Sequence, residues 1–237
     1  MKKNQHKILI ILFLLLLILL SFNFYYFFIR RDVGLYYYVH KILYNSTDKI
    51  LELDIYKDFR EEYFYLNKNY SKPKIVFVGD SITKRFNIQE FTGNCQIINR
   101  GIFFDTTLGL LDRLDANINN LNVDTLFLMI GYNDLLYRTN DDIISNLDLI
   151  ISKLNANRIY IQSLLPVSSE RSDLNDRIID INKHLKIISS KNNIMFIDLH
   201  THFKTNSNCI RPELTSDGIH PNYLGYKLWF SLVEHLL

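Results

Sequence analysis

From residue 74 onward, short apolar segments alternate with longer amphipathic ones, and this alternation restricts the fold more than any other feature of the chain. The apolar segments are continuous rather than alternating with polar residues, which is typical of strands buried on both faces. They are Lys74–Val78, Gln96–Asn99, Asp124–Ile130, Arg158–Gln162 and Ile194–Leu199. Helical periodicity is found in Thr106–Leu121, Asp141–Leu154, Asp173–Ser189 and Asn222–Leu237, and a short helix is expected to start near Ile82. The pattern predicts an α/β domain with a parallel sheet covered by helices on both faces.

The N-terminal part of the chain carries a separate signal. Residues Ile8–Ile29 are almost wholly apolar, and a helix of about 20 such residues is long enough to cross a bilayer. Phe and Tyr occupy the stretch where a signal peptide would have small residues for cleavage, so we expect an uncleaved single-pass anchor in residues 1–31. A cleaved signal peptide is the alternative. Basic residues flank both ends of the run, and the commoner orientation of such an anchor places the following domain outside the cytoplasm.

Residues 32–72 are predicted to connect the anchor to the domain at 73–237. Apolar residues recur at helical spacing within this connector and predict an amphipathic helix that packs on the domain. They are Leu51, Ile55, Phe59, Tyr63 and Leu66.

Charge and cysteine content exclude several classes of function. Residues 1–31 hold five Lys and Arg residues and no Asp or Glu, so the rest of the chain has 22 basic and 25 acidic residues and a net charge of −3. Charged residues are interspersed in the rest of the chain, and no basic stripe predicts nucleic-acid binding. Cys95 and Cys209 do not have the spacing of metal ligands. One disulfide and two free thiols are both compatible with them.

Four short polar segments stand where the predicted strands end or where the last helix begins. They are Gly79-Asp80-Ser81-Ile82, Asn99-Arg100-Gly101, Gly131-Tyr132-Asn133-Asp134 and Asp217-Gly218-Ile219-His220-Pro221. Ligands of open α/β sheets bind beyond the carboxyl ends of the strands. Since Ser81, Gly101 and Asn133 follow the first, second and third strands, we expect them to converge at one edge of the sheet.

The residue types in these segments fit acyl-transfer chemistry. The Ser81 hydroxyl can act as a nucleophile if a base lies beside it, and His220 is the candidate base. Asp217 stands three residues before His220 and can orient the imidazole. Each of these residues also has a plainer use, as a helix cap, a turn residue or a surface histidine. The combination therefore favours a catalytic site more than any one segment does.

An oxyanion hole can be assembled from the same segments. The backbone N–H groups of Ser81 and Gly101 and the side-chain amide of Asn133 are the candidate donors.

With these four segments the chain resembles the GDSL-type, or SGNH, hydrolase family. Ser81, Gly101, Asn133 and His220 match in order the four residues that give the family its second name, and Asp217 fits its Asp-x-x-His element. The resemblance covers about residues 74–237 and is strongest to the branch with platelet-activating-factor acetylhydrolase-like enzymes and bacterial acylesterases. It implies a three-layer α/β/α flavodoxin-like fold. It also implies ester hydrolysis through an acyl-serine, without a metal or an organic cofactor.

Several positions depart from the family pattern. Phe103 and Phe104 stand where related sequences tend to have small residues, and Tyr132 replaces a frequent Thr. We interpret these three as substrate-binding residues that narrow the acyl side of the site. His200 and His202 form a His-x-His pair, but no further ligand cluster accompanies them in the sequence, so no metal site is predicted.

The sequence thus predicts a membrane-anchored serine esterase for short-chain acyl esters, above all acetyl esters of a small molecule or a glycan. An O-acyltransferase that modifies a cell-surface polymer with the same residues is the first alternative. A surface-tethered binding module that has lost catalysis is the second. The oligomeric state is left open.

Overall fold

The computed structural model describes residues 51, 54–69, 75–192 and 194–237. The predicted anchor at 1–31 and the connector up to residue 50 lie outside the described residues. Within the described ranges, no helix is both long enough and apolar enough to cross a membrane.

Five parallel strands form the sheet, in the order β2-β1-β3-β4-β5. The strands are β1 (Ile75–Gly79), β2 (Ile97–Gly101), β3 (Val123–Met129), β4 (Ala156–Gln162) and β5 (Met195–Ile197). All five apolar segments are therefore confirmed as strands, with boundaries shifted by at most two residues. This order is that of flavodoxin-like folds, in which the chain reverses direction across the sheet beside β1 and leaves a crevice at the carboxyl ends of β1 and β3.

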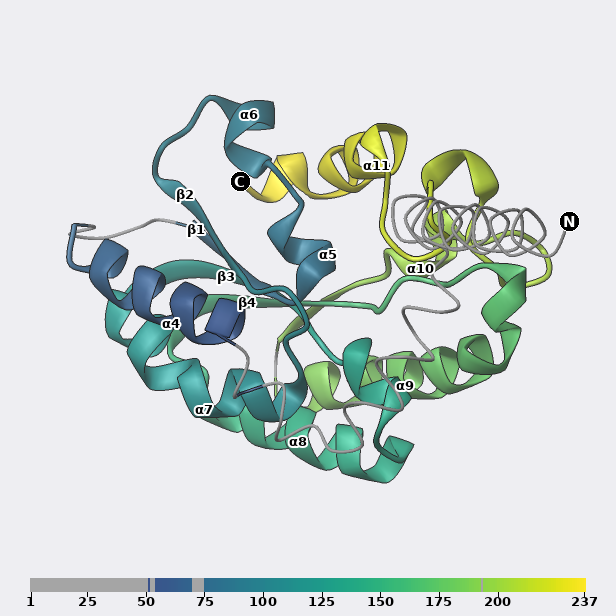
Figure 1. Cartoon of the computed structure of the whole chain (residues 1–237), viewed down its shortest axis with the longest axis horizontal. Helices are drawn as coiled ribbons and strands as arrows, with labels where there is room; N and C mark the ends of the chain where they lie inside the picture. Colours follow the sequence, from purple (N-terminus) through teal and green to yellow (C-terminus); the bar gives the residue numbers. More distant parts are fainter. Residues whose placement is uncertain (1–50, 52–53, 70–74, 193) are drawn as a thin grey trace, which may run out of the picture. The chain divides into compact units, whose positions relative to one another are not determined.

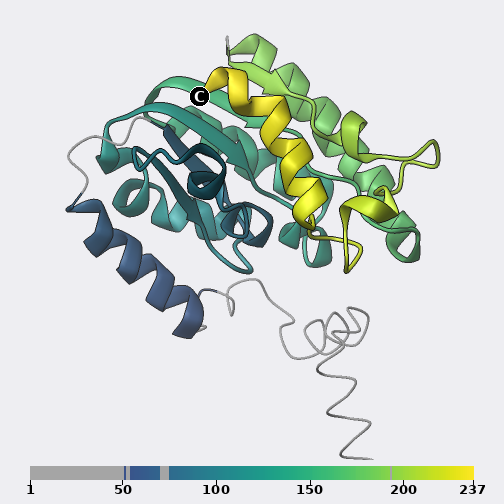
Figure 2. The ribbon, with the colours of Figure 1, turned by 90° about the horizontal axis from the view of Figure 1, so that it is seen from above.

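Helices cover both faces of the sheet (Figure 1). One face carries α7 (Thr107–Asn117), α8 (Asn140–Lys153) and α9 (Ser172–Lys191), which contact one another in that order. The other face carries α5 (Ser81–Lys84), α6 (Ile88–Thr92) and α11 (Tyr223–Val233), seen from above in Figure 2. The remaining short helix is α10 (His200–Phe203), which follows β5. The predicted three-layer α/β/α arrangement is confirmed.

Two predicted helices are shorter than their periodicity suggested. Residues Thr106–Leu121 divide into α7 and a 3-10 turn, Asn119–Leu121, because Ile118 leaves the helical conformation with ψ −65° at φ −127°. The C-terminal segment is helical as α11 and then tightens into a 3-10 turn, Glu234–Leu236. Further 3-10 turns are Asn133–Leu136, Ser169–Arg171 and Pro212–Leu214.

An aromatic column holds α11 to the sheet. Phe77, Phe127 and Tyr160 are cross-strand neighbours on β1, β3 and β4, and their rings stack with centroids 4.5 and 4.7 Å apart. The Phe86 ring packs edge-on against Phe77 and stacks on Trp229 of α11 at 4.6 Å. Aromatic side chains bury large areas and lose few rotatable bonds. The column therefore fixes α11, and the loop before it, over the end of β1.

The amphipathic helix expected before the domain is present as α4 (Asp54–Asn67). It lies beside α7, and it buries Tyr56 and Tyr63. These two rings form a small apolar cluster with Ile102, which follows β2. The helix thus packs against the loop between β2 and α7.

Candidate active site

Ser81, His220 and Asp217 form a continuous chain of short contacts. Ser81 Oγ lies 2.9 Å from His220 Nε2, and His220 Nδ1 lies 2.7 Å from Asp217 Oδ2. Hydrogen bonds of this length join a nucleophile to a base and the base to the group that orients it. The geometry is that of a Ser–His–Asp triad, and it brings together residues that the sequence separates by 139 positions.

Ser81 owes its position to the sharp junction between β1 and α5. It is the first residue of α5, directly after Gly79, which ends the strand, and Asp80, which caps the helix by accepting the Ile82 N–H at 2.9 Å. A first helical residue has no intrahelical partner for its N–H. That group therefore points out of the helix beside the Ser81 hydroxyl, which suits it to stabilise negative charge.

Asp217 is held by the backbone of its own loop. Its Oδ1 accepts the N–H groups of Ile219 at 3.0 Å and His220 at 2.7 Å, which leaves Oδ2 for the imidazole. Burial opposes ionisation of this carboxyl. The hydrogen bonds and charge of His220 outweigh that effect and hold the pKa of Asp217 well below its usual range. The carboxylate is therefore charged and aimed at the base.

A second charged group touches the triad, and the sequence analysis gave it no role there. Arg85 Nη1 lies 3.7 Å from Asp217 Oδ2, and both side chains are partly exposed. The guanidinium adds a weak attraction to the same oxygen that meets His220.

Asn133 begins the 3-10 turn after β3. Its Nδ2 donates a hydrogen bond to the backbone carbonyl of Asp105 at 2.8 Å. An amide nitrogen carries two N–H groups, so this bond orients the side chain and leaves one donor over. Asp134, the next residue, accepts the Thr107 N–H at 2.8 Å and hydroxyl at 2.6 Å. The turn is thus fixed to the start of α7 on both sides.

The structure corrects the role predicted for Gly101. Its N–H already donates to Asn99 Oδ1 at 2.8 Å, and its carbonyl accepts the Tyr63 hydroxyl at 2.7 Å. A Cβ at this position would overlap the backbone of Lys84 and lie 2.9 Å from the carbonyl oxygen of Asp80. Gly101 therefore lets β2 approach α5 closely, and its N–H is not free to meet an oxyanion.

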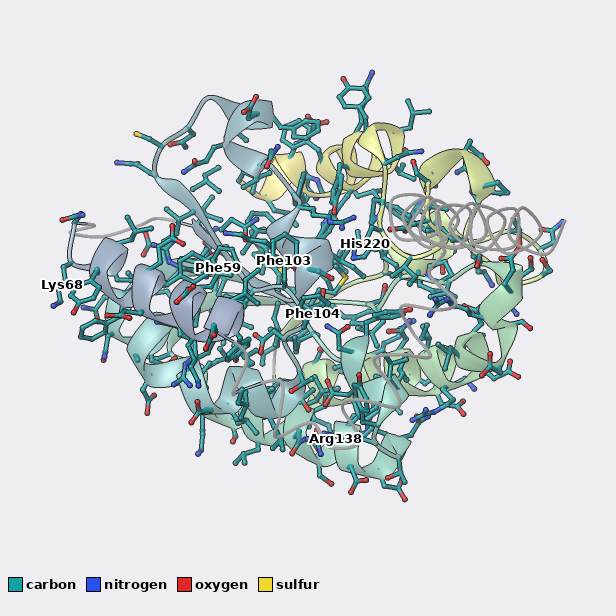
Figure 3. The ribbon with its side chains drawn as sticks, viewed as in Figure 1. Phe59, Lys68, Phe103, Phe104, Arg138 and His220 are labelled. Carbon is teal, nitrogen blue, oxygen red and sulfur yellow. The ribbon has the colours of Figure 1, made fainter. Side chains whose placement is uncertain are left out.

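The bulky residues Phe103, Phe104 and Tyr132 occupy different surroundings. Tyr132 is only 5% exposed. The Phe103 and Phe59 ring centroids are 5.8 Å apart. Figure 3 labels both side chains beside α4. Phe104 packs on the cluster of Tyr56, Tyr63 and Ile102. Both phenylalanines are half-buried. Their contact with a substrate stays a prediction.

Phe104 has an unusual backbone conformation, with φ of 65°. It is the third residue of a turn that the Asp105 N–H closes on the Ile102 carbonyl at 3.3 Å, a position where glycine is favoured. For a bulky residue this conformation costs roughly 1–2 kcal/mol. Such strain persists where the surroundings enforce it, and it is found mostly at functional sites.

The histidine pair at 200 and 202 does not gather metal ligands. His200 is buried, and its backbone N–H donates to Ser163 Oγ at 2.8 Å. Burial lowers the pKa of His200. Among the described residues, no group of three or more His, Cys, Asp or Glu is placed to hold a metal ion. Cys95 is exposed and Cys209 is buried, and neither is in a disulfide.

The sheet order defines an α/β fold, and Ser81, His220 and Asp217 have the contact geometry of a nucleophile, a base and the carboxylate that orients it. The chain belongs to the GDSL-like lipase/acylhydrolase family, whose profile matches residues 77–228, and it is a carboxylic ester hydrolase. No significant match was found among curated proteins.

Solved structures with similar folds include several acylhydrolases. A Streptococcus pneumonia protein provisionally described as a platelet activating factor is 27% identical, with a TM-score of 0.71 over 79% of this chain and 96% of that one. A GDSL-like lipase from Bacteroides thetaiotaomicron is 22% identical, with a TM-score of 0.65 over 75% and 96%. An acetylxylan esterase from Geobacillus stearothermophilus is 19% identical, with a TM-score of 0.60 over 70% and 94%.

Buried carboxyls beside the site generate a prediction about pH. Burial raises the pKa of Asp80 to about 7 and that of Asp134 to about 6, from an ordinary 3.8. Between pH ~4 and ~7 the folded protein therefore holds protons that the unfolded chain releases, and its free energy of unfolding should fall as the pH rises. Asp217, with a lowered pKa, acts in the opposite sense only at more acidic pH. Urea unfolding at pH 5 and pH 8 measures the difference.

Asp80→Asn keeps an oxygen that can cap α5 and removes one titrating group. Its loss of stability between pH 5 and pH 8 should be clearly smaller than that of the unaltered protein. Asp180→Asn, at an exposed carboxylate, is the matched control and should leave the loss unchanged. An equal loss in the Asp80 variant would contradict the assignment.

Proposed function

We propose that this protein is a membrane-tethered serine esterase that hydrolyses short-chain acyl esters, acetyl esters above all, through an acyl-serine intermediate. The observation that carries the proposal is the unbroken contact from Ser81 Oγ to His220 and on to Asp217. The substrates are esters of small molecules or of a glycan. No metal or organic cofactor takes part in the chemistry we propose.

In the first half of the reaction, Ser81 Oγ attacks the ester carbonyl carbon while His220 Nε2 takes the hydroxyl proton. The imidazolium is stabilised by the charged Asp217, to which Nδ1–H donates. The tetrahedral intermediate collapses, the ester C–O bond breaks, and His220 returns the proton to the leaving alkoxide. The alcohol departs and the acyl group remains on Ser81.

In the second half, water takes the place of the alcohol. His220 accepts a proton from the water as its oxygen attacks the acyl carbon, and then returns that proton to Ser81 Oγ as the bond to the serine breaks. The products are the carboxylic acid and the free enzyme. Two of the similar solved structures reported above are named as a GDSL-like lipase and an acetylxylan esterase, and none of those reported supports the acyltransferase alternative.

We assign the oxyanion to three donors. The Ser81 N–H and the free N–H of the Asn133 amide are two of them. In place of Gly101, the turn at 102–105 is the source of the third, through a backbone N–H group. This turn lies between the two catalytic segments, because the Ile102 N–H donates to Gly79 at the end of β1 and the Asp105 carbonyl holds Asn133.

Different residues support the proposed preference for short acyl chains and the proposed membrane anchor. Phe103 and Phe104 put two large rings on the turn that we assign to the oxyanion hole. Ile8–Ile29 is long and apolar enough to span a bilayer, with the connector 32–72 between it and the catalytic domain at 73–237. We place the domain outside the cytoplasm.

The catalytic roles predict a pattern of losses rather than one loss. Ser81→Ala and His220→Ala should each abolish nearly all hydrolysis of p-nitrophenyl acetate, and the double variant should lose little more, because the two act as a unit. Asp217→Ala should be milder. Asn133→Ala should lower kcat roughly a hundredfold with KM near its original value, since its amide meets the oxyanion in the transition state.

Circular dichroism should show all of these variants folded. Ser145→Ala and His202→Ala, at exposed positions, are matched controls that should keep full activity. Wild-type activity in a folded Ser81→Ala protein would refute the nucleophile assignment.

The acyl-length proposal is tested with p-nitrophenyl esters of increasing chain length. The acetate should be hydrolysed faster than long-chain esters. Phe104→Gly retains the backbone N–H and relieves the positive φ, so it should keep activity on the acetate and gain activity on longer chains. Phe64→Ala, at an exposed ring of α4, should leave the preference unchanged. A preference of the unaltered enzyme for chains of about 12 carbons or more would favour a lipase instead.

The tether predicts that the full chain fractionates with membranes and resists extraction by high salt or carbonate, because burial of an apolar span does not depend on charge. A chain without residues 1–31 should remain in the supernatant. Recovery of a soluble full-length product whose N-terminus begins beyond Arg31 would show a cleaved signal peptide.

A further inference from the structure

A tyrosine from outside the matched family region reaches the centre of the catalytic domain. Tyr56 lies on α4, before the family match begins at residue 77, yet its side chain is fully buried. Its hydroxyl donates to Asp105 Oδ1 at 2.9 Å. Burial raises the pKa of Tyr56, so the hydroxyl keeps its proton and stays a donor.

Asp105 links this tyrosine to the proposed oxyanion hole. Its Oδ2 accepts Nε and Nη2 of the buried Arg113 at 2.9 and 2.7 Å. Its backbone carbonyl accepts Nδ2 of Asn133 at 2.8 Å. Asp105 therefore binds α4 and α7 through its side chain, and it orients the Asn133 amide through its backbone carbonyl.

The same network reaches the strand that leads to the nucleophile. Arg113 Nη2 donates to the carbonyl of Gly79 at 3.3 Å, two residues before Ser81. The Gly79 carbonyl also accepts the N–H of Ile102 at 3.1 Å. Arg113 thus ties Asp105 to the end of β1 and fixes the place of Asp105 relative to the strand that precedes Ser81.

A glycine in α7 makes room for the contact. Gly109 stands in the first turn of the helix, where glycine costs up to about 1 kcal/mol relative to alanine. A Cβ there would overlap Asp105 Oδ1 and lie 2.6 Å from the Tyr56 hydroxyl. Glycine at this position lowers the helix propensity of α7, but a methyl group in its place would clash with both Asp105 and Tyr56.

We propose that Tyr56 is a positioning residue for ester hydrolysis, which holds Asp105 so that the Asp105 carbonyl presents the Asn133 amide to the oxyanion. The role rests on the proposed function, because it requires Asn133 to be an oxyanion donor. It makes α4 part of the catalytic apparatus.

Tyr56→Phe removes only the hydroxyl and keeps the ring in the core. In the full chain it should lower kcat for p-nitrophenyl acetate about tenfold and leave KM within about twofold, because the loosened amide is needed most in the transition state. Tyr63→Phe is the matched control on the same helix. Its buried hydroxyl donates to Gly101, whose N–H is already engaged, and kcat should stay within twofold of the original.

A double-variant cycle with Asn133→Ala separates positioning from general destabilisation. If Tyr56 acts through Asn133, Tyr56→Phe should cost less than twofold in kcat once the amide is absent. An undiminished tenfold loss in the Asn133→Ala background would overturn the proposal. So would wild-type kcat in a folded Tyr56→Phe protein.

Gly109→Ala tests the same contact should Tyr56→Phe fold poorly. Its added methyl group favours the helix but displaces Asp105 from Tyr56, so kcat should fall about tenfold or more and the loss should again vanish without the Asn133 amide. Unchanged kcat would refute the proposal. An Asn133→Ala protein with full activity would instead show that the oxyanion assignment itself is wrong, which is a separate outcome.

Discussion

The hydrogen bond between Ser81 and His220 depends on how α11 is docked, because it joins the start of the domain to its end. The loop that carries His220 has little regular structure, and its position is set by the helix that follows it. Tyr226 of α11 donates to the Ile82 carbonyl at 2.8 Å, one residue beyond the nucleophile. Trp229 stacks on Phe86 and donates to Gln162 Oε1 at 2.7 Å. The packing of α11 on one face of the sheet thus brings the segments with Ser81 and His220 together.

On the opposite face of the sheet, buried charged groups position the proposed oxyanion donors. Asp105 and Arg113 are fully buried. The negative charge of Asp105 contributes to the raised pKa values of Asp80 and Asp134. Burying charged groups opposes folding unless each is paired. Arg113 pairs with Asp105, and Arg138 pairs with Asp134 at 3.2 Å. An apolar cluster would hold α4 and α7 together at lower cost. What the polar network adds is fixed direction for the Asp105 carbonyl and the Asn133 amide, and preorganised dipoles of this kind are the main source of transition-state stabilisation in many enzymes.

Local patterns were enough to predict the five strands and the longer helices, and they singled out Ser81, Asp217 and His220, which the fold brings together. Strands buried on both faces are continuous apolar runs, and Ser81, Asn133 and His220 lie in short motifs beside them, so a few neighbouring residues carry the signal. The role of Gly101 could not be predicted, because its N–H is taken by the side chain of Asn99, and only three-dimensional geometry shows which way that side chain turns. The positive φ of Phe104 was hidden for a similar reason, since the residue type argues against it.

Tyr56 shows a further limit of reading motifs. Tyr56 was not among the apolar residues whose spacing predicted the helix, and its partner Asp105 lies 49 residues away in the chain. Gly109, within the helical segment, was a signal of a close approach between side chains. The sequence alone does not show which side chains approach it. If Tyr56 positions the oxyanion donors, the catalytic unit extends N-terminal to the matched family region at 77–228. The connector would then have two functions, because the same segment that leads from the proposed anchor to the domain also supports the site where the ester is cleaved.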